Sequence, residues 1–224
     1  LLAEFERQVL DPYHEMDFES FAGEVEFIRQ TALELAGTQI RAGNESIEVD
    51  SEVTHGKPTV QFHSQHASMG NHRECELADL LFVFEVQINN IVQHQRAMLV
   101  QAKFEPTSAS SDDRYWNVNM PQLELLHQLP KFDIQATVEY GPFDLDPATK
   151  TFTSYSFAST FQLPFYQSAD RVFSDTNLAN CDFSQKTSRF RPNDFIGFDS
   201  SPSALKRFLQ GTLGQDITDP DTEV

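Results

Sequence analysis

Three polar side chains with a capacity for chemistry flank two apolar segments of the chain. Asp79 directly precedes the apolar run 80–84, and Gln101 and Lys103 follow the apolar run 97–100. Carboxylate and amide oxygens are ligands that Mg²⁺ accepts, and a lysine ammonium can orient water and stabilise negative charge on a phosphate. If the fold brings these side chains together, they suit metal-assisted hydrolysis of a phosphodiester.

Short β-strands are the elements that would have to position these side chains. The run 80–84 has the length of a buried strand and is too short for a typical helix. A strand over 98–104 would alternate its side chains between two faces, with Met98, Val100, Ala102 and Phe104 on one face and Leu99, Gln101 and Lys103 on the other. Because an unpaired ammonium is costly beside a core, we expect Asp79 to be the charged partner of Lys103. The alternative is that Asp79 caps a turn and Lys103 ends the strand in solvent.

This arrangement resembles the PD-(D/E)XK nuclease superfamily. An acidic residue heads one apolar strand, and the next strand ends in Val100-Gln101-Ala102-Lys103, which is similar to the Gln-x-Lys variant of the Mrr-like restriction endonuclease branch. Ala78-Asp79 stands where that family has Pro-Asp, so the proline is absent. The resemblance covers about residues 20–105. It implies an α/β, restriction-endonuclease-like fold with a mixed central sheet flanked by helices and a β-rich C-terminal elaboration.

The resemblance also implies roles for individual residues. Asp79 would be the principal ligand of Mg²⁺ or Mn²⁺, and the Gln101 side-chain oxygen and the Ala102 backbone carbonyl would complete the protein's share of the ligands. Lys103 would orient or help to deprotonate the attacking water and would stabilise charge on the phosphorus centre. Asp79, Gln101 and Lys103 are therefore the expected catalytic residues.

A further carboxylate is expected at the metal site, because Gln101 carries one negative charge fewer than the acid it replaces. Residues 19–36 predict an amphipathic helix with an apolar stripe formed by Phe21, Val25, Ile28, Ala32 and Leu35. In the superfamily an acidic residue of this first helix often completes the site, so Glu24 is the first candidate and Glu26 the second. Glu76, three residues before Asp79, is a third. The alternative for Glu24 is a solvated carboxylate favoured by the helix dipole.

Other segments predict the remaining elements. Residues 46–53 and 58–63 alternate and predict the first hairpin of the sheet, with a turn over 55–58. Beyond it we expect loops over 64–71 and 106–114, a helix over 121–128, strands over 132–140 and 151–161, a helix over 202–213 that exposes Lys206 and Arg207, and a fraying tail over 215–224. A short helix is also expected within 1–18. We expect one domain over 1–224, with a core over about 19–140 and the elaboration over 141–224, as a piece of a longer chain.

A group of histidines offers a second metal hypothesis. His55, His63, His66 and His72 lie near Cys75 in sequence, and imidazole and thiolate are zinc ligands. The spacing fits no common zinc pattern, and one cysteine is few for such a site. Polar loop histidines that contact phosphate are the favoured interpretation.

Composition limits the choice of partners. The 224 residues carry 34 acidic and 16 basic side chains, for a formal net charge of −18. A nucleic-acid-binding protein usually needs a basic surface, so DNA binding would require a local basic patch, a partner protein or a fused domain. A generally acidic host is another explanation of the charge. No apolar run approaches the roughly 18 residues of a membrane span, and the two cysteines suggest no disulfide framework, so we expect a cytoplasmic protein without membrane contact.

The resemblance therefore implies a metal-dependent endonuclease domain that hydrolyses DNA, as the effector of a prokaryotic anti-phage defence system. The alternatives are a catalytically silent nuclease-fold interaction module and an unrelated acidic α/β domain in which Asp79 and Lys103 form a buried salt bridge. DNA or RNA as substrate, strand state, specificity, homo-oligomerisation and the identity of any partner stay open at this point. So does the choice among Glu24, Glu26 and Glu76.

Overall fold

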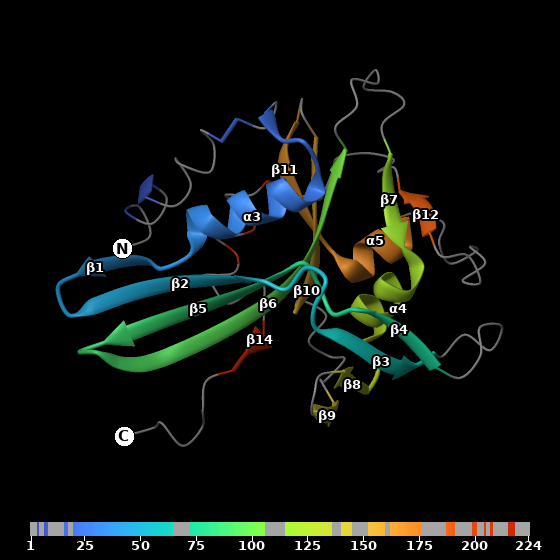
Figure 1. Ribbon diagram of the computed structural model, residues 1–224. Helices are drawn as coiled ribbons and strands as arrows, with labels where there is room; N and C mark the ends of the chain where they lie inside the picture. The colour runs from blue at the N-terminus through green and yellow to red at the C-terminus, as the bar shows by residue number, and fades with distance from the viewer. Residues whose placement is uncertain are drawn as a thin grey trace.

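The fold is described from a computed structural model (Figure 1). The described residues are 4, 7–8, 16–17, 20–64, 72–105, 115–135, 140–144, 152–159, 162–175, 187–190, 199–200, 204, 207 and 215–217. The predicted loop 106–114, most of the predicted loop 64–71 with His66, and Lys206 lie outside this part. So do most of the predicted helices within 1–18 and 202–213; of the latter, Ala204 is buried and Arg207 is exposed.

The largest sheet is mixed and has eight strands within the described residues. In spatial order it contains β1 (Thr38–Ala42), β2 (Glu45–Val53), β5 (Leu80–Ile88), β6 (Ile91–Glu105), β10 (Thr153–Ser159), β11 (Gln162–Ser168) and β13 (Asp199–Ser200), and β14 (Gln215–Asp216) pairs with β6. β6 and β10 run parallel, whereas the other pairs are antiparallel. The predicted strand over 151–161 is thus β10, which joins the sheet directly beside β6. The tail prediction is wrong at its start, because β14 is paired there.

Helices cover both faces of this sheet. On one face lies α3 (Glu24–Leu35), which packs on β2 and β6. On the other lie α4 (Met120–Gln128), the predicted helix with proline in its first turn, and α5 (Ala169–Asp175) (Figure 1). Each face has its own apolar cluster, so the sheet is the middle of three layers. The α/β class with a mixed central sheet is confirmed.

The two faces of β6 follow the predicted alternation. The cluster under α3 takes Met98, Val100, Ala102 and Phe104, and the cluster under α4 takes Leu99. Gln101 and Lys103 share the face of Leu99, and both are buried. A strand with period two therefore carries two polar side chains into the interior of the molecule.

The predicted hairpin of β2 with the next strand is wrong. β2 pairs with β1 and β5, whereas β3 (Thr59–His63) belongs to a second sheet with β4 (His72–Glu76), β8 (Phe132–Gln135) and β9 (Tyr140–Phe143). The reason is that the two strands serve different cores. Ile47 and Val49 of β2 pack in the cluster under α3, and Val60 and Phe62 of β3 pack with Leu125 and Phe132.

The segment 132–140 does not form the single predicted strand. It contributes β8 and the start of β9, which pair antiparallel, with 136–139 outside the described residues. A further pair is formed by β7 (Trp116–Asn119) and β12 (Thr187–Phe190). None of the helices described in this structure is long and apolar enough to cross a membrane.

Helix α3 begins five residues later than the predicted start at 19. The N-cap is Gly23, and the Glu26 carboxylate in the first turn accepts a hydrogen bond from the Ala22 N–H at 2.8 Å. With this start Val25 is 40% exposed, so its predicted place in the stripe is wrong, and Phe27 is buried instead. The later start leaves Glu24 in the first helical turn, above the end of β6 that carries Lys103.

Candidate metal centre

The candidate centre lies where β5 begins and β6 continues past it. The register pairs Leu80 with Val100, whereas β6 extends to Glu105. Asp79 sits at the open edge of β6 that results. Its N–H donates to the Val100 carbonyl at 3.1 Å, and its Oδ2 accepts from the Ala102 N–H at 2.9 Å. The N–H and C=O of one strand residue point to the same side of the strand, so the Ala102 carbonyl also faces Asp79. The Gln101 amide nitrogen lies 3.4 Å from the Ala102 carbonyl oxygen.

The Asp79 side chain is completely buried. Its Oδ1 lies 2.7 Å from His55 Nδ1, and its Oδ2 accepts from the Gln101 amide as well as from the Ala102 N–H. Burial raises the pKa of Asp79, while the positive charge of Lys103 and the hydrogen bond with His55 act in the opposite direction. The ionised carboxylate is thus only partly compensated by the protein, and an additional cation would stabilise it.

The Gln101 side chain shows the clearest sign of a missing partner. It is 1% exposed, and its amide nitrogen donates to Asp79. Its Oε1 is buried and has no hydrogen-bond partner. A buried carbonyl oxygen without a partner costs about 1–3 kcal/mol, so this oxygen is available to a ligand in the adjacent cavity.

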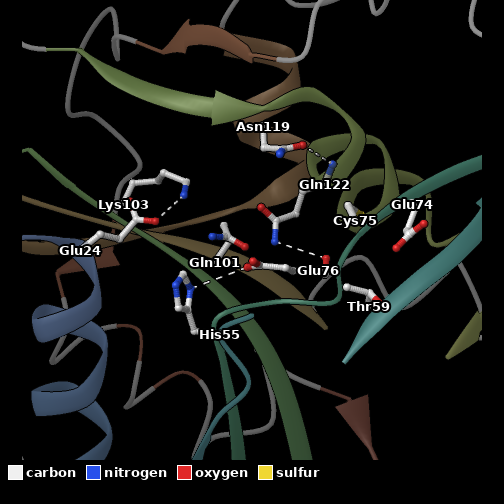
Figure 2. Close-up of a pocket in the computed structure, with 10 residues that line it drawn as sticks. All are labelled: Glu24, His55, Thr59, Glu74, Cys75, Glu76, Gln101, Lys103, Asn119 and Gln122. Carbon is white, nitrogen blue, oxygen red and sulfur yellow. Dashed lines mark hydrogen bonds and ion pairs between the residues drawn. The ribbon is translucent and has the colours of Figure 1, made fainter. Parts of the chain in front are cut away.

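The charged partner of Lys103 is Glu24, and the prediction that Asp79 would be that partner is wrong. Lys103 Nζ lies 2.9 Å from Glu24 Oε1, and the two side chains point toward one another (Figure 2). Asp79 is instead engaged by His55, Gln101 and Ala102. The first turn of α3 supplies the nearest carboxylate to Lys103. Asp79 still acts at longer range, because the charge of Lys103 lowers its pKa.

Two residues that received no leading role from the sequence complete the centre. His55 Nδ1 lies 3.7 Å from Glu76 Oε2, and single ligand atoms of His55, Glu76 and Asp79 all lie within 4.8 Å of one another. Glu76, the third candidate for the added carboxylate, is therefore part of this cluster. Glu26 is turned toward Ala22 and lines a different cavity. The sequence offered His55 only as a member of the histidine group and not as a neighbour of Asp79. Its place beside Asp79 depends on the turn between β2 and β3, two strands that join different sheets.

The structure does not bring the predicted histidine group together. His63 and His72 face one another at the opposite end of the β3–β4 pair from Glu76, with ring centroids 5.5 Å apart. Burial raises the pKa of the Cys75 thiol to about 12, which disfavours the thiolate that zinc requires. His66 lies outside the described residues. The zinc hypothesis in its predicted form therefore has no support from the described members.

A cavity of about 560 Å³ opens in front of these groups. Its lining is formed by Glu24, His55, Thr59, Glu74, Cys75, Glu76, Gln101, Lys103, Asn119 and Gln122 (Figure 2). Three carboxylates line it, and Asp79 lies directly behind, whereas Lys103 and His55 are its basic members. A cavity with this excess of carboxylates attracts cations, and it repels a phosphate group that is not accompanied by a cation.

The donors present fit a divalent cation. Asp79, Glu76 and the Ala102 carbonyl offer oxygen atoms, and the unpartnered Gln101 Oε1 adds a neutral one. Oxygen donors with a net negative charge are what Mg²⁺ and Mn²⁺ prefer. All four predicted residues, Asp79, Gln101, Ala102 and Lys103, meet at this place, and Glu24 reaches it through Lys103.

No protein-family model, no curated protein and no solved structure matches this chain. The interpretation of the centre therefore rests on its own geometry and on the short motif that heads β5 and ends β6.

Proposed function

We propose that this chain is a metal-dependent nuclease domain of the PD-(D/E)XK type that hydrolyses phosphodiester bonds in DNA. One observation carries the proposal: Asp79, Gln101 and the Ala102 backbone converge at the open edge of β6, with Lys103 one residue further along and a cavity in front of them. Within the main sheet the chain passes from β1 and β2 to β5, headed by Asp79, and then to β6, which carries Gln101-x-Lys103 near its end. β3 and β4 lie between β2 and β5 in the chain and belong to the second sheet.

The ligands of Mg²⁺ or Mn²⁺ in this proposal are Asp79, the Gln101 oxygen and the Ala102 carbonyl, with Glu76 as the added carboxylate. The bound cation supplies positive charge that makes water nucleophilic near neutral pH and stabilises the departing oxygen. Glu76 replaces Glu24 as the added carboxylate, because Glu24 is occupied by Lys103. Restoring the second negative charge in this way compensates for the amide at Gln101.

Lys103 acts on the reacting groups. The oxygen of a water attacks phosphorus, the bond from phosphorus to one bridging oxygen breaks, and that oxygen takes up a proton, which yields a phosphate monoester and a hydroxyl. The Lys103 ammonium donates hydrogen bonds that orient the water and stabilise the negative charge on the non-bridging oxygens. Glu24 is a positioning residue in this scheme, because its carboxylate 2.9 Å from Nζ holds the ammonium at the cavity.

The net charge of −18 shapes the rest of the proposal. An acidic body with an acidic cavity gains little from long-range attraction to DNA, so we assign DNA affinity to a partner protein, a fused domain or a second copy of the chain. Cleavage of both strands by such folds commonly uses two copies. The role as effector of a prokaryotic antiviral defence system, in the cytoplasm, belongs to the same proposal and follows from the Mrr-like motif alone.

A second candidate function is a silent nuclease-fold module that binds a partner protein. It is favoured by the fact that Asp79 already receives hydrogen bonds from Gln101 and Ala102 and that Lys103 is paired with Glu24. Such a network can stabilise a strand end without any cation. The two functions differ in their response to metal, because only a metal-binding native state is stabilised by Mg²⁺ or Mn²⁺.

Plasmid cleavage with Mg²⁺ and with Mn²⁺ tests the proposal. The parent protein should cleave, and Lys103→Ala should reduce cleavage by about 10²- to 10³-fold, because an electrostatic group at the reacting atoms is lost. Lys131→Ala is the matched control, since Lys131 is 67% exposed and pairs with Asp144 away from the cavity. Cleavage that survives in Lys103→Ala would contradict the proposal, and so would a parent protein that neither cleaves DNA nor is stabilised by Mg²⁺ or Mn²⁺.

A further inference from the structure

One further donor of the same centre, His55, lies beside Asp79 and Glu76 and has no role in the proposed ligand set. Asp79 Oδ2 is directed at Gln101 and Ala102, whereas Oδ1 is directed at His55 Nδ1, 2.7 Å away. The same imidazole nitrogen lies 3.7 Å from Glu76 Oε2. One nitrogen thus stands between two carboxylate oxygens, and Figure 2 shows the His55 ring and the Glu76 carboxylate directed at one another.

A hydrogen-bond explanation of this trio is incomplete. Nδ1 carries at most one proton and can donate it to only one of the two carboxylates. Two carboxylates at such short separation repel each other unless a positive charge lies between them. A divalent cation that accepts nitrogen and oxygen ligands would satisfy all three groups at once.

The backbone holds the three side chains in place. The turn that carries His55 is attached to the start of β5: the Thr54 N–H donates to the Asp79 carbonyl at 2.9 Å, and Thr54 Oγ1 donates to the Ala78 carbonyl at 2.9 Å. The end of β4 that carries Glu76 is attached to β3 and α4: the Leu77 N–H donates to the Pro58 carbonyl at 3.0 Å, and Gln122 Nε2 lies 3.4 Å from the Glu76 carbonyl. Preorganised ligands favour binding, because little conformational entropy is lost.

An independent observation also points to a ligand here. Gln101 Oε1 is buried, has no hydrogen-bond partner and belongs to a side chain that lines the same cavity as His55 and Glu76. Gln101 is 1% exposed, so water does not readily compensate this oxygen. The unpartnered oxygen and the two outer members of the trio therefore belong to side chains that line one cavity.

We propose that His55 and Glu76 are metal ligands together with Asp79, and that the imidazole makes the centre select Mn²⁺, and other first-row cations that accept nitrogen, over Mg²⁺. Mg²⁺ takes nearly all of its ligands as oxygen and retains several waters. Imidazole is a ligand of first-row transition cations, a series that begins with Mn²⁺ and in which affinity for mixed nitrogen and oxygen sites rises toward Co²⁺ and the cations after it. The inference deepens the proposed function, since it names the cation of the same centre. The binding of metal by the trio does not itself depend on cleavage.

Calorimetric titration of the intact chain with MnCl₂ and with MgCl₂ separates the possibilities, beside the visible absorption spectrum of the Co²⁺ complex. The parent should bind Mn²⁺ at least about tenfold more tightly than Mg²⁺. His55→Gln should weaken Mn²⁺ binding by about 10- to 100-fold, leave Mg²⁺ binding within about threefold, and change the Co²⁺ spectrum by loss of a nitrogen ligand. Glu76→Gln should weaken both cations, and His94→Gln, an exposed histidine on β6, should change neither.

The outcomes distinguish this inference from the proposed function. If His55→Gln and Glu76→Gln both melt like the parent without metal and bind Mn²⁺ and Co²⁺ as the parent does, the trio is not a metal site. Equal weakening of Mg²⁺ and Mn²⁺ by His55→Gln would overturn the selectivity. Metal-dependent cleavage by the parent, together with Mn²⁺ binding and Mn²⁺-supported cleavage that are both insensitive to His55→Gln, would sink the inference and leave the nuclease standing. If metal binding requires His55 but the protein cleaves no DNA, the inference stands and the proposed nuclease function fails.

Discussion

Two completely buried carboxylates, Asp79 and Glu124, lie in contrasting surroundings. Glu124 projects from α4 toward the second sheet, where it lies 3.5 Å from Arg73 Nε and accepts from the Ser64 hydroxyl at 2.7 Å. A permanent cation and a hydroxyl compensate its charge, and it does not line the large cavity. Asp79 has an amide, a backbone N–H and a histidine as its neighbours, and it lies directly behind that cavity. Glu124 therefore joins two layers of the fold, whereas the surroundings of Asp79 fit the cation of the proposed function.

We expect the largest effect on stability from substitution of Glu124. Glu124→Ala leaves the Arg73 side chain, which is 8% exposed, without this carboxylate. Removing one partner of a buried ion pair costs about 3–5 kcal/mol of unfolding free energy. Urea unfolding of the parent and the variant measures this loss, which should be the same with and without Mn²⁺. A loss of unfolding free energy below about 1 kcal/mol is typical of an exposed ion pair and would mean that Glu124 is not a structural carboxylate.

Asp79→Asn should behave in the opposite way in the absence of metal. The amide removes a buried charge and can still accept a hydrogen bond from the Ala102 N–H, so the unfolding free energy should stay within about 1 kcal/mol of the parent. Urea unfolding under metal-free conditions checks this. A loss comparable with that of Glu124→Ala would mean that Asp79 is itself a structural carboxylate.

The pH dependence of stability sharpens the same point. Burial raises the pKa of Asp79, so the folded chain holds this proton more tightly than the unfolded chain does. Asp79 therefore contributes stability below the ordinary carboxyl pKa, and this contribution is lost as the pH rises through the raised value. Urea unfolding from about pH 4 to about pH 7 should show the metal-free parent losing stability relative to Asp79→Asn. If the parent instead gains unfolding free energy relative to Asp79→Asn as the pH rises from about 4 to about 7, the pKa of Asp79 is not raised in the folded chain.

The smallest effects on stability concern Glu24 and Lys131. Glu24→Gln should lower the unfolding free energy by only about 1 kcal/mol, because 30% of the Glu24 side chain is exposed. The same substitution should slow cleavage by about 10- to 100-fold, because Lys103 is then misplaced.

Lys131→Ala, in a pair whose side chains are 67% and 60% exposed, should change the unfolding free energy by less than about 0.5 kcal/mol and leave cleavage unchanged. Equal cleavage rates for Glu24→Gln and the parent would remove Glu24 from the centre.

Local pattern accounts for the parts of the centre that the sequence predicted. Strand periodicity placed Gln101 and Lys103 on one face of β6, and the apolar run after Asp79 indicated the strand that it heads. The gathering of Asp79, Gln101 and Ala102 then follows from the antiparallel pairing of β5 with β6. These features depend on neighbouring segments, whose spacing can be read directly.

The parts that the sequence did not predict depend on contacts between distant segments. His55 reaches Asp79 because β2 and β3 separate into two sheets, and Glu76 arrives on β4, which was not predicted. The partner of Lys103 was misassigned because the start of α3 at Glu24 is set by Gly23 and by the hydrogen bond of Glu26 with Ala22. Periodicity contains no information about which sheet a strand joins.

The most direct test is the thermal unfolding of the parent, Asp79→Asn and Glu124→Gln, each with and without Mn²⁺. At a concentration of about 100 times the dissociation constant, Mn²⁺ should stabilise the parent by about 2.7 kcal/mol. Glu124→Gln should melt lower than the parent but gain the same increment, and Asp79→Asn should gain none. An equal gain in Asp79→Asn, or no gain in the parent, would contradict the proposal that Asp79 is the carboxylate of a metal centre.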